Sequence, residues 1–176
     1  MRTLKLQMTV SLEGKWDKGM SDFSIENLES VGCILHGRNT GIEFIPYWEK
    51  VANNPNEPDY MLGKRFSEIP NFIFSNTITE NALNNTTIIH GDFITAIQNL
   101  KNKNGKDIMV YGGETFVSSL IQFGFTDAYY ILINPAAIGN GKQSFNPLFN
   151  NVKLNFESSQ AFNCGAVLLH YLKKSN

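Results

Sequence analysis

The stretch DIMVYGGETFVSSLIQF, residues 107–123, carries the strongest structural signal in the chain. It begins with an apolar run over residues 107–111, typical of a buried strand, and then enters a turn at Gly112 and Gly113. Apolar side chains recur at helical spacing over residues 115–123. Because a strand that passes through glycines into an amphipathic helix is the βα unit of a parallel sheet, the stretch predicts an α/β protein.

The rest of the chain repeats this alternation. Period-two or apolar runs predict strands at residues 4–10, 31–36, 72–75, 87–90 and 128–133. Helical spacing predicts helices at residues 24–30 and 42–51, and another after an N-cap at Asp92. Residues 152–156 and 166–172, around a turn at 163–165, predict a closing hairpin. Together they predict a three-layer α/β/α fold with a mixed, mostly parallel sheet and an antiparallel C-terminal hairpin.

Two details of the expected helices are specific. Residues 14–22 read as a loop, and the helix after it is capped by Ser21, Asp22 or Ser24. Pro46 must lie in the first turn of the next helix or break it, because proline has no N–H to donate to the preceding turn.

Length and composition limit the class of protein. The 176 residues fit a single domain spanning residues 1–176. Lys and Arg number 15 against 16 Asp and Glu, so no excess positive charge is available for nucleic acid. Cys33 and Cys164 lie far apart, and neither a signal peptide nor an apolar run of about 20 residues is found. We expect a cytoplasmic protein with reduced thiols and no membrane or nucleic-acid partner.

Three short motifs follow predicted strands, where open α/β sheets bind ligands. The first is Gly37-Arg38-Asn39-Thr40. Its glycine permits close backbone approach, its arginine can pair with phosphate oxygens, and its threonine adds a hydroxyl at a helix start. An ordinary strand-to-helix turn with a surface arginine explains the motif equally well.

The second motif is Gly112-Gly113-Glu114-Thr115, and the third is Ser75-Asn76-Thr77. Adjacent glycines leave room for a diphosphate or a nicotinamide against bare backbone, although a tight turn uses them as readily. The hydroxyls of the third motif are a weak signal alone. A phosphate-containing ligand is therefore indicated only by the three motifs in combination.

The familiar nucleotide fingerprints are absent. Gly139-Asn140-Gly141 lacks the third glycine of G-x-G-x-x-G, and no Ser or Thr follows directly after its Gly-Lys pair. His36, His90 and His170 do not have metal-ligand spacing, so each is interpreted as a strand or strand-end residue. No metal site is predicted.

The order of these motifs resembles the dihydrofolate reductase superfamily, and within it the C-terminal reductase domain of the riboflavin biosynthesis protein RibD. The resemblance covers about residues 3–173. It rests on Ser11-Leu12-Glu13-Gly14, Gly37-Arg38-Asn39-Thr40, Ser75-Asn76-Thr77, Tyr111-Gly112-Gly113 and the closing hairpin. Glu13 departs from the aspartate that is usual at its position.

The resemblance implies an NADPH-dependent reductase with a small-molecule substrate. The first motif would bind phosphates of the adenosine half, Ser75 would lie near the 2′-phosphate, and the double-glycine motif would line the pyrophosphate and nicotinamide. Residues 11–20 would cover the nicotinamide as a lid. The cofactor-binding residues implied are Gly14, Gly37, Arg38, Thr40, Ser75, Gly112, Gly113, Glu114 and Thr115.

The substrate and the proton donor stay open at this stage. The resemblance implies either a 5-amino-6-(5-phosphoribosylamino)uracil reductase or a dihydrofolate reductase, and Arg65 is the one candidate for a folate carboxylate. Asp22 matches the carboxylate that supports protonation in dihydrofolate reductases, and a helix cap is the competing interpretation.

Two further readings concern partners and turnover. A module that binds NADPH or a folate-like ligand without turnover would contain the same arginine and glycines. The strand at residues 128–133, or the C-terminal hairpin, could pair across a homodimer, a mode to which family members are prone.

Overall fold

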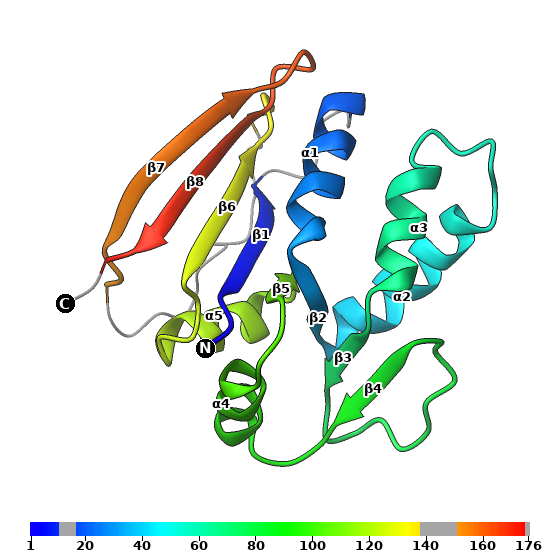
Figure 1. Ribbon diagram of the computed structural model, residues 1–176, viewed down its shortest axis with the longest axis vertical. Helices are drawn as coiled ribbons and strands as arrows, with labels where there is room; N and C mark the ends of the chain where they lie inside the picture. Colours follow the sequence, from blue (N-terminus) through cyan, green and yellow to red (C-terminus); the bar gives the residue numbers. More distant parts are fainter. Residues whose placement is uncertain (11–16, 138–150, 175–176) are drawn as a thin grey trace.

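The computed structural model describes residues 1–10, 17–137 and 151–174. Its centre is an eight-stranded sheet in the order β4-β3-β2-β5-β1-β6-β8-β7 (Figure 1). The strands are β1 (Leu4–Val10), β2 (Val31–Gly37), β3 (Asn71–Phe74), β4 (Thr86–Ile89), β5 (Asp107–Tyr111), β6 (Ala128–Ile133), β7 (Leu154–Ala161) and β8 (Val167–Lys173). The helices are α1 (Lys18–Glu29), α2 (Arg38–Ala52), α3 (Tyr60–Glu68), α4 (Phe93–Asn102) and α5 (Glu114–Gln122).

The predicted mixed sheet is confirmed. Strands β4, β3, β2, β5, β1 and β6 run parallel, while β8 pairs antiparallel with both β6 and β7. Because β6 is hydrogen-bonded on both edges, to β1 and to β8, it has no edge free for a second copy. The idea that residues 128–133 pair across a dimer is therefore wrong, and a homodimer through the hairpin stays a prediction.

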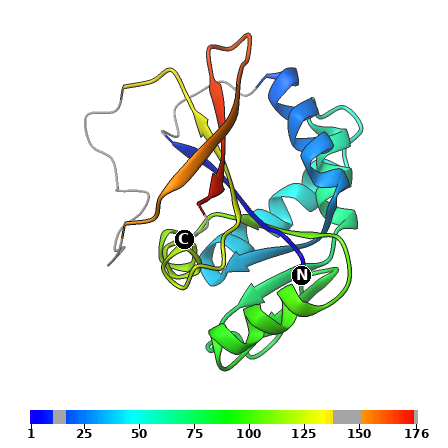
Figure 2. The ribbon, with the colours of Figure 1, turned by 60° about the vertical axis from the view of Figure 1, so that its left-hand side comes forward.

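Helices cover both faces of the sheet (Figure 2). Helices α4 and α5 bury Ile97 and Leu120 against β1, β2, β5 and β6 on one face. Helices α1 and α3 bury Leu28 and Phe66 against Ile34 and other side chains of the opposite face, where α2 adds Phe44. The layered architecture follows from the alternation of strands and helices seen in the sequence.

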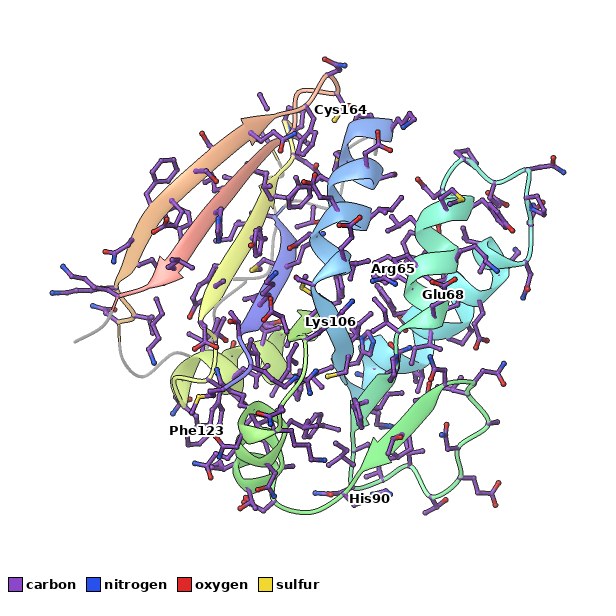
Figure 3. All side chains as sticks on the ribbon, in the orientation of Figure 1. Arg65, Glu68, His90, Lys106, Phe123 and Cys164 are labelled. Carbon is purple, nitrogen blue, oxygen red and sulfur yellow. The ribbon has the colours of Figure 1, made fainter. Side chains whose placement is uncertain are left out.

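Helix α1 begins earlier than predicted. Its N-cap is Asp17, whose Oδ1 accepts a hydrogen bond from Met20 N at 2.9 Å. The second carboxylate oxygen accepts from Cys164 N at 3.0 Å, at the tip of the β7–β8 hairpin (Figure 3). These hydrogen bonds lower the Asp17 pKa. The loop prediction is therefore wrong from residue 18 onward, and so is the proposal of Ser21, Asp22 or Ser24 as the cap.

Two further differences concern α2 and α3. Pro46 lies in the interior of α2, not in its first turn, and the helix continues through it to Ala52. Pro46 is exposed, so the Ile42 carbonyl that loses its helical donor is on the solvent side. Helix α3 was not predicted, because its short length and the preceding polar residues conceal its apolar face of Leu62 and Phe66.

A buried lysine ties three elements together at the amino-terminal edge of the sheet. Lys101 of α4 is 5% exposed, and its Nζ donates to Phe125 O at 2.7 Å and to Asp127 Oδ2. The same carboxylate oxygen accepts from Leu4 N, at the start of β1, at 2.7 Å. Asp127 thus fixes the starts of β1 and β6 relative to α4.

Two sequence expectations about environment can be compared with the described residues. Cys33 and Cys164 are free cysteines, as expected. Within residues 1–10, 17–137 and 151–174, no helix combines the length and apolar character needed to span a membrane.

Replacing Lys101 by methionine should lower the free energy of unfolding by about 2–3 kcal/mol, because the Phe125 carbonyl and the Asp127 carboxylate would lose their cationic donor. The measurement is urea unfolding followed by circular dichroism. The matched control is Lys18→Met, since Lys18 is exposed and its ion pair within the described residues is with exposed Asp22. An equal effect of the two changes would contradict the anchoring role of Lys101.

Candidate functional site

The three strand-end motifs meet in one cleft of about 600 Å³. Strands β2, β3 and β5 are parallel neighbours, so their carboxyl ends meet at the same edge of the sheet. The lining residues are Gly37, Arg38, Asn39, Thr40, Phe74, Ser75, Asn76, Ile89, Gly91, Phe93, Gly113, Glu114, Thr115, Phe116 and Ser119. The sequence therefore identified the principal lining segments of this cleft.

Two helices begin at glycines beside the cleft. Gly37 is the N-cap of α2 and Gly113 is the N-cap of α5, and neither start is capped by a side chain. Amide groups in the first turn of a helix have no intrahelical acceptor, and the helix dipole adds partial positive charge there. The cleft thus has two converging helix starts that are suited to an anion.

Glycine is required where these segments approach each other. Gly112 and Gly113 have φ values of +61° and +82°, in the left-handed region that side chains disfavour. A Cβ on Gly113 would lie 3.2 Å from Thr40 Oγ1, and one on Gly37 would lie 2.9 Å from Phe116 Cβ. The α2 and α5 starts can therefore lie this close only because both carry bare backbone.

The charged lining side chains differ in sign. Arg38 and Glu114 are both exposed, each in the first turn of its helix. Among the lining residues of the cleft, Arg38 supplies the cation and Glu114 the anion. A phosphate group would therefore be attracted to the α2 side of the cleft, where Arg38 and the helix start act together.

Hydrogen bonds hold the third motif, Ser75-Asn76-Thr77, in one conformation. Ser75 Oγ accepts from Thr77 N at 3.1 Å and from Ile78 N at 3.2 Å. Asn76 Oδ1 accepts from Gly91 N at 2.8 Å, which ties the loop after β3 to the loop after β4. Ser75 Oγ also lies 3.3 Å from Thr77 Oγ1, and either of these two hydroxyls can be the donor.

The predicted site residues fall into three groups. Those that line the cleft are Gly37, Arg38, Thr40, Ser75, Gly113, Glu114 and Thr115, with Gly112 directly beside them. Gly14 lies outside the described residues, as do residues 11–16 of the expected lid, while residues 18–20 belong to α1. Asp22 lies on α1 with its carboxylate exposed and 2.6 Å from Lys18 Nζ, and it is not among the residues that line the cleft.

A buried polar cluster lies between β1 and α1. The sequence did not indicate it. Gln7 Oε1 accepts from Tyr111 OH and from Asn27 Nδ2, each at 3.2 Å, and Gln7 Nε2 donates to Ser24 Oγ at 3.3 Å. Gln7 appeared in the sequence as a solvent-facing strand residue, yet it is 7% exposed because α1 covers that face. Burial raises the pKa of Tyr111, which keeps its hydroxyl a donor.

The cluster lies where the direction of chain connections changes. Gln7 and Tyr111 are register partners in adjacent β1 and β5. The chain leaves β1 through α1 on one face and leaves β5 through α5 on the other, so the topological switch point of the sheet lies between these two strands. The Gln7 cluster lies at this switch point, on the α1 side of the sheet.

His36 lies directly before Gly37 and is fully buried. Asn71 Nδ2 donates to Ile69 O, so Asn71 Oδ1 faces the ring and accepts from His36 Nε2 at 2.9 Å. Burial lowers the His36 pKa to about 4, although the Asn71 contact acts in the opposite direction. His36 is therefore neutral at physiological pH and supports the end of β2 as a structural side chain, in keeping with its interpretation as a strand residue.

Three phenylalanines of the cleft were interpreted in the sequence as core or strand residues. Phe74, Phe93 and Phe116 pack against one another with ring centroids 5.2–5.7 Å apart. Each is half-buried, and each lines the cleft. The sequence analysis did not distinguish them from ordinary core residues, because their exposure to the cleft depends on how distant elements pack.

Comparison with known proteins places the chain in a family. The model of the RibD C-terminal domain matches residues 3–168, so the chain belongs to the RibD C-terminal domain family, a family of reductases. The resemblance and the fold class predicted from the sequence are thereby confirmed.

Individual proteins are similar to this chain in sequence or in fold. The uncharacterized Bacillus subtilis protein YyaP is 28% identical over 158 residues, covering 88% of this chain and 79% of that protein. A putative riboflavin biosynthesis protein from Shewanella superposes with a TM-score of 0.73 at 18% identity, covering 98% and 99% of the two chains. Dihydrofolate reductase from Enterococcus faecalis, solved with NADP(H), superposes with a TM-score of 0.62 at 11% identity, covering 98% of this chain and 97% of that chain.

The lowered pKa of His36 predicts a specific loss of stability in acid. Between pH 6.5 and 4 the unfolded chain gains a proton on His36 that the folded chain does not accept, so stability falls as the pH falls through this range. Between pH 7 and pH 4 the free energy of unfolding should fall by about 2–3 kcal/mol more in the wild-type protein than in His36→Gln.

Urea unfolding at a series of pH values measures this difference, with His90→Gln as the control because His90 is exposed. Parallel stability profiles for wild type and His36→Gln would show that His36 is not held neutral by burial.

Proposed function

We propose that this protein is an NADPH-dependent reductase that delivers hydride to a small heterocyclic or ribosylaminouracil-type substrate. The observation that carries the proposal is the pair of glycine-capped helix starts, α2 and α5, that open on one cleft beside Arg38. A dinucleotide has the elongated, anionic shape that such a cleft accommodates. The family and the NADP(H) complex of the similar dihydrofolate reductase support the choice of cofactor.

The residues of the cleft fit the parts of this cofactor. Arg38 would form charge-assisted hydrogen bonds to phosphate oxygens, and Thr40 would add a hydroxyl beside them. Ser75 would donate to the 2′-phosphate side. The backbone of Gly112 and Gly113, with Glu114 and Thr115, would line the pyrophosphate and the nicotinamide; a Cβ on either glycine would lie 3.1–3.2 Å from Thr40.

The strand order indicates how the cofactor would be oriented in the cleft. Gly113 follows β5, next to the switch point at β1, whereas Ser75 follows β3 near the outer edge of the sheet. The nicotinamide end would therefore lie near the switch point between β1 and β5, and the adenosine end near β3 and β4. When bound, NADPH supplies the hydride, and the protein supplies position and the exclusion of water.

The substrate would occupy the α1 side of this switch point. Gln7, Asn27 and Tyr111 supply neutral hydrogen-bonding groups on this side. Arg65 donates to Leu28 O at 3.0 Å and lies 3.7 Å from Glu68, so its guanidinium is already engaged between α3 and α1. Because the Arg65 guanidinium is already engaged, these contacts disfavour a folate-like substrate, whose carboxylate needs a free arginine. Asp22 as proton donor stays a prediction.

The direct test is oxidation of NADPH, followed by its near-ultraviolet absorbance, with dihydrofolate and with the phosphoribosylaminouracil as separate substrates. We expect turnover with the aminouracil. Turnover with dihydrofolate alone would shift the substrate assignment to folate. Tight NADPH binding without turnover on either substrate would favour a sensor and overturn the reductase proposal.

Arg38→Ala should weaken NADPH binding by roughly 1–3 kcal/mol, because a charge-assisted contact to phosphate is lost. Isothermal titration calorimetry measures the dissociation constant. Lys50→Ala removes a cation from the last turn of the same helix and serves as the control. Unchanged affinity in Arg38→Ala would exclude the assigned phosphate contact.

Gly113→Ala should lower the free energy of unfolding by about 1–2 kcal/mol and also impair NADPH binding, since its Cβ would strain a left-handed backbone and crowd Thr40. Gly105→Ala is the matched control, because Gly105 also has a positive φ but lies in the loop before β5. Chemical unfolding and calorimetry report the two effects. The site assignment fails if both variants bind NADPH as wild type does.

A further inference from the structure

An aromatic wall extends from the start of α5 to the outer end of the cleft. It consists of Phe74 at the end of β3, Phe93 at the start of α4 and Phe116 in the first turn of α5. The ring of Phe93 lies at 73° to that of Phe74, with centroids 5.7 Å apart, and at 77° to that of Phe116, with centroids 5.6 Å apart. The three form a fixed apolar surface that is half exposed to the cleft.

The position of this wall matches the adenosine end of the proposed cofactor. Phe74 and Phe93 adjoin β3 and β4, the two outermost strands on that side of the sheet, while the nicotinamide end is assigned to Gly113 beside β1. A dinucleotide with its diphosphate between the α2 and α5 starts would carry its second base outward over β3 and β4. That base would then meet Phe93 and Ile89.

Three of the polar side chains beside the wall, Ser75, Asn76 and Ser119, are hydrogen-bonded within the protein. Asn76 Oδ1 accepts from Gly91 N, and Ser75 Oγ accepts from two amides of its own loop. Ser119 Oγ donates to Thr115 O at 2.9 Å. Reading the 6-amino group of adenine requires an acceptor atom placed at the base edge, and Ser75 Oγ and Asn76 Oδ1 are already engaged by backbone amides.

From these observations we infer that the wall of Phe74, Phe93 and Phe116 holds the adenine by packing on its flat face and leaves its 6-position unread. Every purine has an aromatic face, so packing of this kind tolerates a change at the base edge. The protein should therefore accept a dinucleotide with hypoxanthine in place of adenine. This inference rests on the proposed function.

Binding of NADP⁺ and of its hypoxanthine analogue to the wild-type chain tests the inference without turnover. We expect dissociation constants within about threefold of each other, because no hydrogen bond to the 6-position is lost. A loss of tenfold or more for the analogue would overturn the inference while leaving the proposed function intact. Absence of binding by both nucleotides would overturn the proposed function itself.

A second measurement assigns the contact to Phe93. Phe93→Ala should weaken NADP⁺, its hypoxanthine analogue and 2′,5′-ADP by a similar factor, roughly tenfold, as loss of a stacking partner predicts. Phe123→Ala is the control: Phe123 packs 6.3 Å from Phe93 but does not line the cleft, and Figure 3 labels it at the end of α5. Equal affinities of the Phe93 variant and wild type for 2′,5′-ADP would overturn the assignment.

Discussion

The close approach of two helix starts is the constraint on which the site depends. Helices α2 and α5 belong to different βα units, and their first turns meet because Gly37 and Gly113 present backbone where a side chain would collide with Phe116 or Thr40. Bringing two positive helix ends together is unfavourable unless an anion or solvent screens them. The arrangement therefore makes physical sense as a preformed receptor for a negatively charged group, and Arg38 strengthens it.

The sheet places this receptor next to a second, chemically different environment. The double-glycine turn stands between the cleft at the two helix starts and the region between β1, β5 and α1, where Gln7 accepts hydrogen bonds from Asn27 and Tyr111. A hydride donor and its acceptor must lie close together in a site from which water is excluded. The adjacency of the two environments on neighbouring strands meets that geometric requirement, with rigid strands setting the separation.

Much of this could be predicted from sequence because the signals are local. The strand over residues 107–111, the glycine turn and the Asp92 cap appear in the structure where periodicity and capping chemistry place them. Local patterns also located the three motifs of the cleft. They did not locate the start of α1, because Asp17 caps it with help from the distant Cys164 amide, a contact that no local pattern contains.

The misread residues share the same cause. Gln7 alternates with apolar residues and so resembled a solvent-facing position, but α1 covers it and its amide is satisfied by side chains 17 to 104 residues away. Phe93 and Phe116 have helical core spacing, and only the convergence of two helix starts turns part of each ring toward a cleft. Long-range packing decides such cases, and one sequence does not reveal it.

A crystal structure of the protein with bound NADP⁺ tests the central claim most directly. The account predicts that the diphosphate lies between the first turns of α2 and α5, within hydrogen-bond distance of Arg38, with the nicotinamide beside Gly112 and Gly113. A dinucleotide bound elsewhere, or reversed so that its nicotinamide rests on β3 and β4, would contradict it.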